Sequence, residues 1–419
     1  MNLYNKIIFS EAWFWRALLA LLGFSVPIST ALDNVLLALL LIFGLVKYRR
    51  DVLRIGYRNP VAQAALLLFG MLLIATFYGA APLDEAFDTL GKYLDLAMIP
   101  LYIAVMRENQ SGDSALNGFL LAMLLTLILS YLVGIGVLGI QPWMEMHSSV
   151  ASPAIFRHQL TQNTFMALAI FFALLRMRAA TGLLWRAAWG AFALLGIFNV
   201  LFMVQGRTGY VTLSILLGWF AWTTLAKNLN ARGKPVGWRH AMAVTLAMAL
   251  LVSGVYFFSA RLQERVNLIV SDLKSWDPQT RSNTSVGIRM QFYYNTLQII
   301  RQNPALGVGT GGLTPAYAQQ DKNFDTWQVR NPHNEYLMVA VQTGIVGLAL
   351  LLYLFYTQWR VAPLLESAFR QDAARGLMLA TAADCLFNSP LLDHAPGLLF
   401  ALMSATLFAS LGRDQKRGE

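Results

Sequence analysis

The chain alternates between long apolar runs and short polar breaks. The runs are roughly 16–25 residues long, close to the ~20 residues that an α-helix needs to cross the ~30 Å hydrocarbon core of a bilayer. The pattern therefore predicts an all-α polytopic membrane protein with about 12 transmembrane helices. We place these helices at residues 14–31, 32–46, 61–79, 91–106, 115–138, 159–175, 187–204, 211–226, 241–259, 334–357, 373–388 and 396–411.

One polar segment interrupts this pattern and divides the chain into three parts within a single integrated membrane domain. Residues 1–260 hold the first nine predicted spans, residues 261–333 form a large loop, and residues 334–419 hold the last three spans. Within the loop, Arg261 to Trp276 has apolar positions on one face and is expected to be helical. A second helix is expected from Val286 to Gln302, where Asn303-Pro304 ends it. The large loop is therefore mostly helical.

Composition supports a membrane protein and excludes a water-soluble domain. Hydrophobic residues make up 57% of the chain, charged residues only 13%, and the mean hydropathy is +0.51. Soluble domains carry about 25% charged residues. The single cysteine, Cys385, excludes an internal disulfide and a cysteine-based metal site.

The chain has a net charge of +10, and its basic residues are distributed unevenly among the short loops. Lys and Arg gather in one set of loops, including residues 47–58 and 227–239, whereas the opposite set contains the acidic turn 84–88. Short cytoplasmic loops collect basic residues, so both termini are expected in the cytoplasm and residues 261–333 on the outer face. The charge is thus an orientation signal, and we expect no nucleic-acid partner.

The outward segments contain the side chains that could carry chemistry. Arg207 lies in the polar break Gln205 to Tyr210, at the edge of the bilayer, where a charge either snorkels to water or binds an anionic ligand. The flanking Gly206 and Gly209 permit close approach of another group, which favours ligand binding. Arg157, on an earlier outward segment, is a candidate for substrate binding on its charge and location alone.

The large loop adds a second cationic candidate and a histidine. Arg289 lies in the first turns of the second predicted helix, and Tyr293 follows one turn later on the same face. His333 stands at the mouth of the next span, either as a functional group or as an interfacial histidine bonded to a neighbour. The run 307–312 is rich in glycine but lacks the P-loop pattern, which leaves a turn or a phosphate-binding nest. Scattered acids and the lack of a histidine pair argue against a divalent metal site in the loop, and we expect no cofactor.

Several of these residues form a signature. The chain has His333-Asn334, then nine residues, then Gly344-Ile345-Val346-Gly347. This pattern is similar to the His-Asn/Ser/Gln-x9-Gly-x-x-Gly signature of bacterial O-antigen ligases. Three further stretches resemble the same ligase and polymerase superfamily: Gly206 to Gly209, Gly287 to Met290 with Tyr294, and Asn303 to Gly311. The resemblance covers residues 205–347 in detail.

The resemblance implies a glycosyltransferase C-like fold and a specific reaction at the periplasmic face of the bacterial inner membrane. Members transfer O-antigen polysaccharide from undecaprenyl diphosphate to a sugar of the lipid A-core, without ATP or metal. By motif position, the family's essential residues fall on His333, Arg289 and Arg207, while Tyr210, Tyr293 and Asn334 are candidates for substrate binding. The implied partners are the lipid-linked polysaccharide, the lipid A-core acceptor and membrane lipid.

The residue chemistry agrees with this reaction. Arginine pairs bidentately with phosphate oxygens and can stabilise a diphosphate leaving group in place of a metal ion. A histidine suits the general base that removes the acceptor's proton, although a phosphate-binding histidine is equally compatible with the sequence. Attack opposite the diphosphate would invert the anomeric centre.

Two other functions stay open from the sequence. The first is an O-antigen polymerase or a protein O-oligosaccharyltransferase of the same superfamily; Arg301 to Gly312 has the Arg-x10-Gly spacing of polymerases. The second is a transporter for a lipid or an anionic solute, which would use an outward basic vestibule without catalysis. The chain shows no internal repeat and few charges near the middle of its spans, which argues against transport.

Overall fold

The computed structural model is all-helical through the residues that it describes, which are 3–109, 112–258, 260–278, 283–320 and 329–411. This confirms the predicted all-α class. The long helices are α1 (Leu3–Ser25), α2 (Thr30–Arg58), α3 (Pro60–Ala75), α4 (Leu83–Lys92), α5 (Leu94–Glu108), α6 (Ser114–Gly134), α7 (Gln159–Ala179), α8 (Leu183–Phe198), α9 (Arg207–Ala231), α10 (Trp238–Phe258), α11 (Ala260–Ser275), α12 (Ser285–Gln302), α13 (Leu313–Gln320), α14 (Glu335–Val361), α15 (Ala368–Asp384) and α16 (His394–Phe408). Two short helices, η1 (Asn199–Met203) and η2 (Ala362–Leu364), extend α8 and α14.

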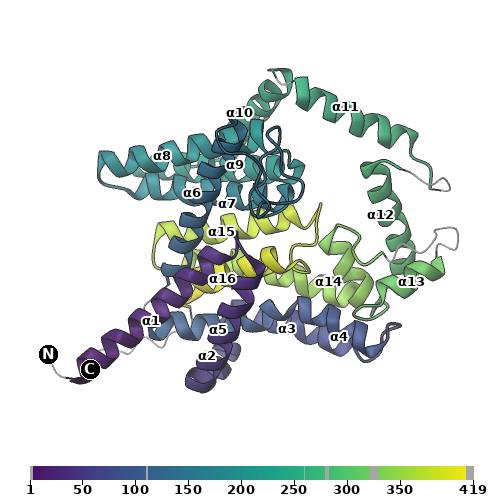
Figure 1. Ribbon diagram of the computed structural model, residues 1–419, viewed down its shortest axis with the longest axis horizontal. Helices are drawn as coiled ribbons and strands as arrows, with labels where there is room; N and C mark the ends of the chain where they lie inside the picture. The colour runs from purple at the N-terminus through teal and green to yellow at the C-terminus, as the bar shows by residue number, and fades with distance from the viewer. Residues whose placement is uncertain (1–2, 110–111, 259, 279–282, 321–328, 412–419) are drawn as a thin grey trace.

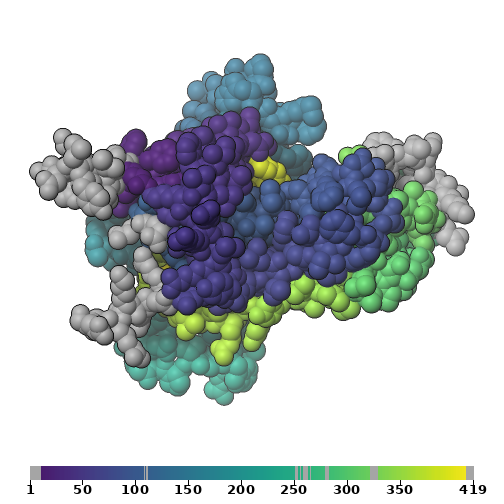
Figure 2. Space-filling view, turned by 90° about the horizontal axis from the view of Figure 1, so that it is seen from below, coloured from purple at the N-terminus to yellow at the C-terminus, as the bar shows by residue number. Residues whose placement is uncertain are grey.

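The helices form two packed groups joined through α14, α15 and α16. In one group α7 packs against α8, α9 and α15; in the other α5 packs against α2, α3 and α16. In Figure 1, α1 begins at the left of the view while α12, α13 and α4 lie at the right. The space-filling view shows α2 to α5 covering one face of the molecule, with the green surface of the α12–α13 region at its end (Figure 2).

Six helices of the described chain are long and apolar enough to cross a membrane, or seven if the bent pair α4 and α5 counts as one span. Each of the twelve predicted ranges overlaps a helix, but the prediction of twelve spans is not confirmed. Apolar side chains are exposed along outer helices such as α2 and α8, as expected of surfaces that face lipid. The protein is therefore a multi-pass membrane protein.

Glycines bring two of the long helices into backbone contact. At Gly23 of α1 an added Cβ would meet the backbone of Ala115, and at Gly118 of α6 it would meet the backbone of Ala20. Small residues at such crossings let membrane helices approach closely. The N-terminal helix is thereby fixed against the body of the bundle.

The large polar segment is mostly helical where it is described. Its first helix, α11, spans Ala260–Ser275 and its second, α12, spans Ser285–Gln302, which confirms both predicted helices to within a residue. The Thr284 hydroxyl accepts a hydrogen bond from the Gly287 amide (3.1 Å) and caps α12 at its start. Helix α11 packs mainly against its neighbours α10 and α12, so it extends away from the bundle core (Figure 1).

The glycine-rich run fastens this segment to a break in α14. The backbone of Gly344 has φ 65° and ψ −158°, which interrupts the helix in a region that only glycine occupies readily. The amides of Val308 and Gly309 donate to the carbonyls of Val341 (2.8 Å) and Gln342 (2.9 Å), which the break leaves without helical partners. The Ile345 amide on the far side of the break donates to a loop carbonyl, that of Pro304 (2.9 Å).

The same run also reaches α3. The Thr310 amide donates to the Ala75 carbonyl (3.1 Å), and the Gly311 amide donates to the side chain of Gln342 (3.1 Å). Its amides are thus committed to protein acceptors, and the alternative of a phosphate-binding nest does not apply. The run is a rigid connector that sets the position of α12 relative to the start of α14.

Candidate functional site

His333 occupies a strained position immediately before α14. Its φ of 56° is the one positive value among the described residues other than glycine. The His333 amide donates to the Asn331 side chain (2.7 Å), and its carbonyl accepts a hydrogen bond from the Tyr293 hydroxyl (3.2 Å). Its ring stacks on Phe292 of α12, with centroids 6.3 Å apart. Strain that neighbours hold in place in this way is frequent at functional sites.

Asn334 caps α14 and ties it to the loop between α15 and α16. Its side-chain oxygen accepts the Leu337 amide (3.0 Å), while its side-chain nitrogen donates to the Leu386 carbonyl (3.0 Å). From the same loop, the Ser389 hydroxyl donates to Asn331 (2.7 Å). Residues 385–389, which follow α15, therefore contact the residues on either side of His333, and we call them the floor of the site.

Arg289 supplies positive charge to this junction. It lowers the pKa of His333, although burial of the imidazole is the larger cause of that lowering. Burial raises the pKa of Tyr293, and Arg289 opposes the rise. His333 is consequently neutral at pH 7 and able to accept a proton, while a fixed cation lies within electrostatic reach of it.

The start of α9 is connected to the same floor. Arg207 is the first residue of this helix, and its neighbour Thr208 accepts a hydrogen bond from the side chain of Asn388 (3.2 Å). The Asn388 carbonyl in turn accepts the amide of Glu335 (3.0 Å), two residues beyond His333. Tyr210 follows Arg207 on the same face of α9, half-buried against the core.

Both glycines beside Arg207 serve close approach, but the group that approaches is helix α7 and not a ligand, so they no longer favour ligand binding by Arg207. A Cβ at Gly206 or Gly209 would collide with Asn163 of α7. The Asn163 side chain donates to the carbonyl of Val204 (2.9 Å), which holds the entry of α9 against α7. Gly206 itself has an ordinary φ of −121°, so packing and not backbone conformation requires glycine there.

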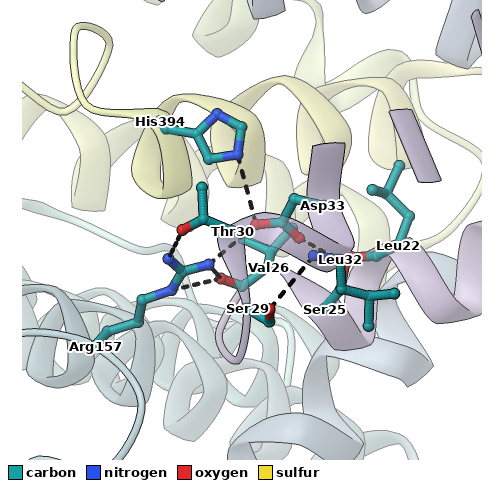
Figure 3. Close-up of polar contacts among 9 residues, drawn as sticks. All are labelled: Leu22, Ser25, Val26, Ser29, Thr30, Leu32, Asp33, Arg157 and His394. Atoms are coloured by element: carbon teal, nitrogen blue, oxygen red, sulfur yellow. Dashed lines mark hydrogen bonds and ion pairs between the residues drawn. The ribbon is translucent and has the colours of Figure 1, made fainter. Parts of the chain in front are cut away.

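Arg157 has a different environment from the other predicted site residues (Figure 3). Its guanidinium donates to the Val26 carbonyl (2.6 and 3.0 Å), to the Thr30 hydroxyl (2.5 Å) and to Asp33 (3.0 Å). Its side chain is only 14% exposed, and that of Asp33 is fully buried. His394 approaches the same carboxylate, with Nε2 3.6 Å from Oδ2. These contacts make Arg157 a link between the α1–α2 turn and the loop before α7, so its predicted role in substrate binding gains no support.

The sequence missed the residues that orient the site. The side chains that contact His333 or its neighbours do not belong to the signature; they are Asn331, Phe292, Asn388 and Ser389. Asn331 stands in the polar run that ends the large segment, and Asn388 lies at the start of the break between the last two predicted spans, which are weak signals. Throughout the described residues, no group of three or more His, Cys, Asp or Glu side chains could hold a metal ion.

The arrangement combines a neutral imidazole, a nearby guanidinium and the basic start of another helix. A guanidinium can neutralise charge on phosphate oxygens, and a neutral imidazole can take a proton from a hydroxyl. A cavity of about 210 Å³ adjoins the same region, lined by Arg330 and Met338 on one side and by Asp84, Glu85 and Lys92 of α4 on the other.

Comparison with known proteins identifies the region that carries this arrangement. Residues 191–352 match a family model described as O-antigen ligase, a stretch that includes Arg207, Arg289, His333 and the glycine break at Gly344. An uncharacterized protein of Haemophilus influenzae is 28% identical over 118 residues, which is 27% of this chain and 29% of that protein. The match thus spans less than a third of that relative. The match to residues 191–352 supports the O-antigen ligase/polymerase superfamily, whose members are glycosyltransferase-like membrane enzymes.

Proposed function

We propose that the protein transfers O-antigen polysaccharide from undecaprenyl diphosphate to a sugar hydroxyl of the lipid A-core. The reaction takes place at the periplasmic face of the bacterial inner membrane, with both termini of the protein in the cytoplasm. The observation that carries the proposal is the neutral, strained His333 beside Arg289, inside the segment that matches the O-antigen ligase family.

In this mechanism the two arginines bind the donor and the histidine activates the acceptor. Arg289 and Arg207 pair with the diphosphate oxygens and stabilise the charge that develops as the bond from the anomeric carbon to the diphosphate oxygen breaks. His333 removes the proton from the acceptor hydroxyl as its oxygen attacks the anomeric carbon. The products are an inverted glycosidic bond and free undecaprenyl diphosphate, so the donor itself supplies the free energy without ATP or a metal ion.

The neighbouring polar side chains position these groups. Tyr293 bonds to the His333 carbonyl, and Asn334 fixes the first turn of α14, so both act on the histidine through the backbone. A change of about 1 Å at such a site costs about 10²-fold in rate. Tyr210, which follows Arg207 on α9, is the candidate for contact with the first sugars of the donor.

The proposal is tested by replacing His333 with alanine and measuring polysaccharide display on lipopolysaccharide. Display should be lost while the protein still inserts, and the purified variant should fail to transfer glycan from the lipid diphosphate. Arg289→Lys should also fail, because a lysine lacks the planar fork of arginine. Unchanged display by His333→Ala would remove the histidine from the mechanism.

Gene deletion separates the ligase from related activities. A ligase deletion abolishes all O-antigen capping of the lipid A-core, whereas a polymerase deletion leaves single-repeat caps. Loss of protein glycosylation with normal lipopolysaccharide would instead indicate a protein O-oligosaccharyltransferase. Failure of the purified protein to transfer any glycan would favour the transporter.

A further inference from the structure

A second cavity lies away from His333, at the far end of α12. It has a volume of about 510 Å³, within the roughly 300–1,000 Å³ typical of ligand sites. Three parts of the chain form it: the turn after α3, the end of α12, and α13. Figure 2 shows the blue surface of α3 and α4 meeting the green surface of this region at one end of the molecule.

The lining of this cavity is polar but uncharged. Its polar side chains are four carboxamides and a phenol: Gln302, Asn303, Gln319, Gln320 and Tyr78. None of the described residues that line it is acidic or basic. In this it contrasts with the cavity beside α4, where acidic residues stand opposite Arg330.

This chemistry selects the kind of ligand. A diphosphate or a metal ion would find no opposite charge among the described lining residues, and an apolar lipid tail would offer the carboxamides no hydrogen bond. Each carboxamide offers two N–H donors and a carbonyl acceptor, which matches hydroxyl groups that both donate and accept. The Tyr78 ring, 41% exposed, adds an apolar face for the C–H side of a sugar ring. An uncharged, polyhydroxylated ligand fits all of these features.

The walls of the cavity are fixed before any ligand binds. The Tyr78 hydroxyl donates to the Leu306 carbonyl (2.7 Å), and the Ala80 amide donates to the Val308 carbonyl (2.9 Å). The Gln302 side chain donates to that of Gln320 (3.1 Å) across the gap between α12 and α13. Because the glycine-rich run is itself bonded to α14 and α3, ligand binding need not order this loop.

The position of the cavity relates it to the proposed reaction. Arg289 and Gln302 belong to the same helix, 13 residues apart, which corresponds to about 20 Å along its axis. A sugar chain with its reacting end beside Arg289 would need several units to reach the carboxamides. The cavity would then bind the part of the glycan that does not react.

We propose that this cavity is a subsite for the uncharged sugar units of a glycan chain, several units from the reacting end. The inference rests on the proposed function for the identity of the glycan, but the binding itself does not require transfer. The sugars come either from the polysaccharide donor or from the core oligosaccharide acceptor, and both present the same hydroxyl-rich surface.

The test measures binding of lipid-free glycans to the purified full-length protein by calorimetry or saturation-transfer NMR. One probe is the O-polysaccharide of the source strain and the other is its core oligosaccharide, both released from lipid by mild acid. The variant combines Gln302→Ala with Gln319→Ala, two exposed positions where the fold should tolerate alanine. Loss of their hydrogen bonds should weaken binding roughly tenfold or more. Gln141→Ala, at an outward glutamine that does not line the cavity, is the matched control and should bind as the parent does.

The outcomes separate the subsite from the reaction. His333→Ala should bind the glycan normally while transferring none, and binding that prefers one probe identifies that substrate as the occupant. In the transfer assay, the double glutamine variant should lose activity with long chains more than with a single repeat if the donor is the occupant. Equal binding by parent and double variant, or no binding of either probe to the parent, overturns the subsite and leaves the assignment of His333 untouched. Transfer by His333→Ala would instead overturn the proposed mechanism without altering the binding result.

Discussion

The break in α14 yields a prediction whose magnitude follows from the structure. Replacing Gly344 with alanine forces an L side chain into a backbone region with φ 65° and ψ −158°, which costs about 1–3 kcal/mol. The added Cβ would also collide with the backbone at Ala305 and Leu306, which has no side chain to rotate away. The loop must therefore move, and each docking hydrogen bond that it loses costs a further ~1 kcal/mol. We expect destabilisation of several kcal/mol in total.

The assay is thermal unfolding of the purified variant in detergent, followed by glycan transfer at a temperature where it is still folded. Gly344→Ala should unfold well below the parent and transfer poorly, because the displaced loop carries α12 and hence Arg289 away from His333. Gly70→Ala is the matched control: this glycine lies within α3 and has nothing within 4 Å of an added Cβ. It should be neutral or stabilising by about 0.5–1 kcal/mol. Parent-like unfolding and transfer by Gly344→Ala would refute the reasoning.

Two further predictions concern charged groups. Because burial and Arg289 lower the pKa of His333 from its ordinary 6.5, the acid limb of kcat/KM should lie below that value. In a pH titration of His333 followed by NMR, Arg289→Met should move the midpoint upward, while Arg289→Lys, which keeps the positive charge, should leave it in place; an acid limb at or above 6.5 in the parent would contradict this. Arg157→Ala should destabilise the protein by about 3–5 kcal/mol, since it removes the guanidinium that pairs with the buried Asp33 carboxylate. The double change to Arg157→Ala with Asp33→Asn should recover much of that loss in a thermal unfolding assay, and no recovery would indicate that Arg157 acts mainly through its bonds to Val26 and Thr30.

Local sequence signals predicted the helices well. The apolar periodicity and the Asn303-Pro304 stop placed α11 and α12 to within a residue, because amphipathic spacing and proline act over a few neighbouring positions. The number of membrane spans is a different quantity. It depends on the length of each continuous helix as well as on its hydropathy, and six or seven of the described helices, by length and composition, could cross a membrane where hydropathy alone predicted twelve.

The candidate site, too, could be predicted from the sequence only in part. The signature located His333, Arg289 and Arg207, since these residue types in that order are legible along the chain. The positive φ of His333 and the lowering of its pKa were not legible, because the first depends on Asn331 and Tyr293 and the second on burial and on Arg289.

By itself, the sequence determined that the chain is an all-helical membrane protein and which segment resembles the O-antigen ligases, because hydropathy and short motifs are local properties. Only the tertiary structure decided what the remaining groups do. It paired Arg157 with Asp33, which lies 124 positions away in the chain, and so gave that arginine a structural role. It also showed that amides of the glycine-rich run donate hydrogen bonds to the carbonyls that the break at Gly344 leaves free. A buried charge or an unpaired carbonyl must find a partner, and only the fold determines which distant residue supplies it.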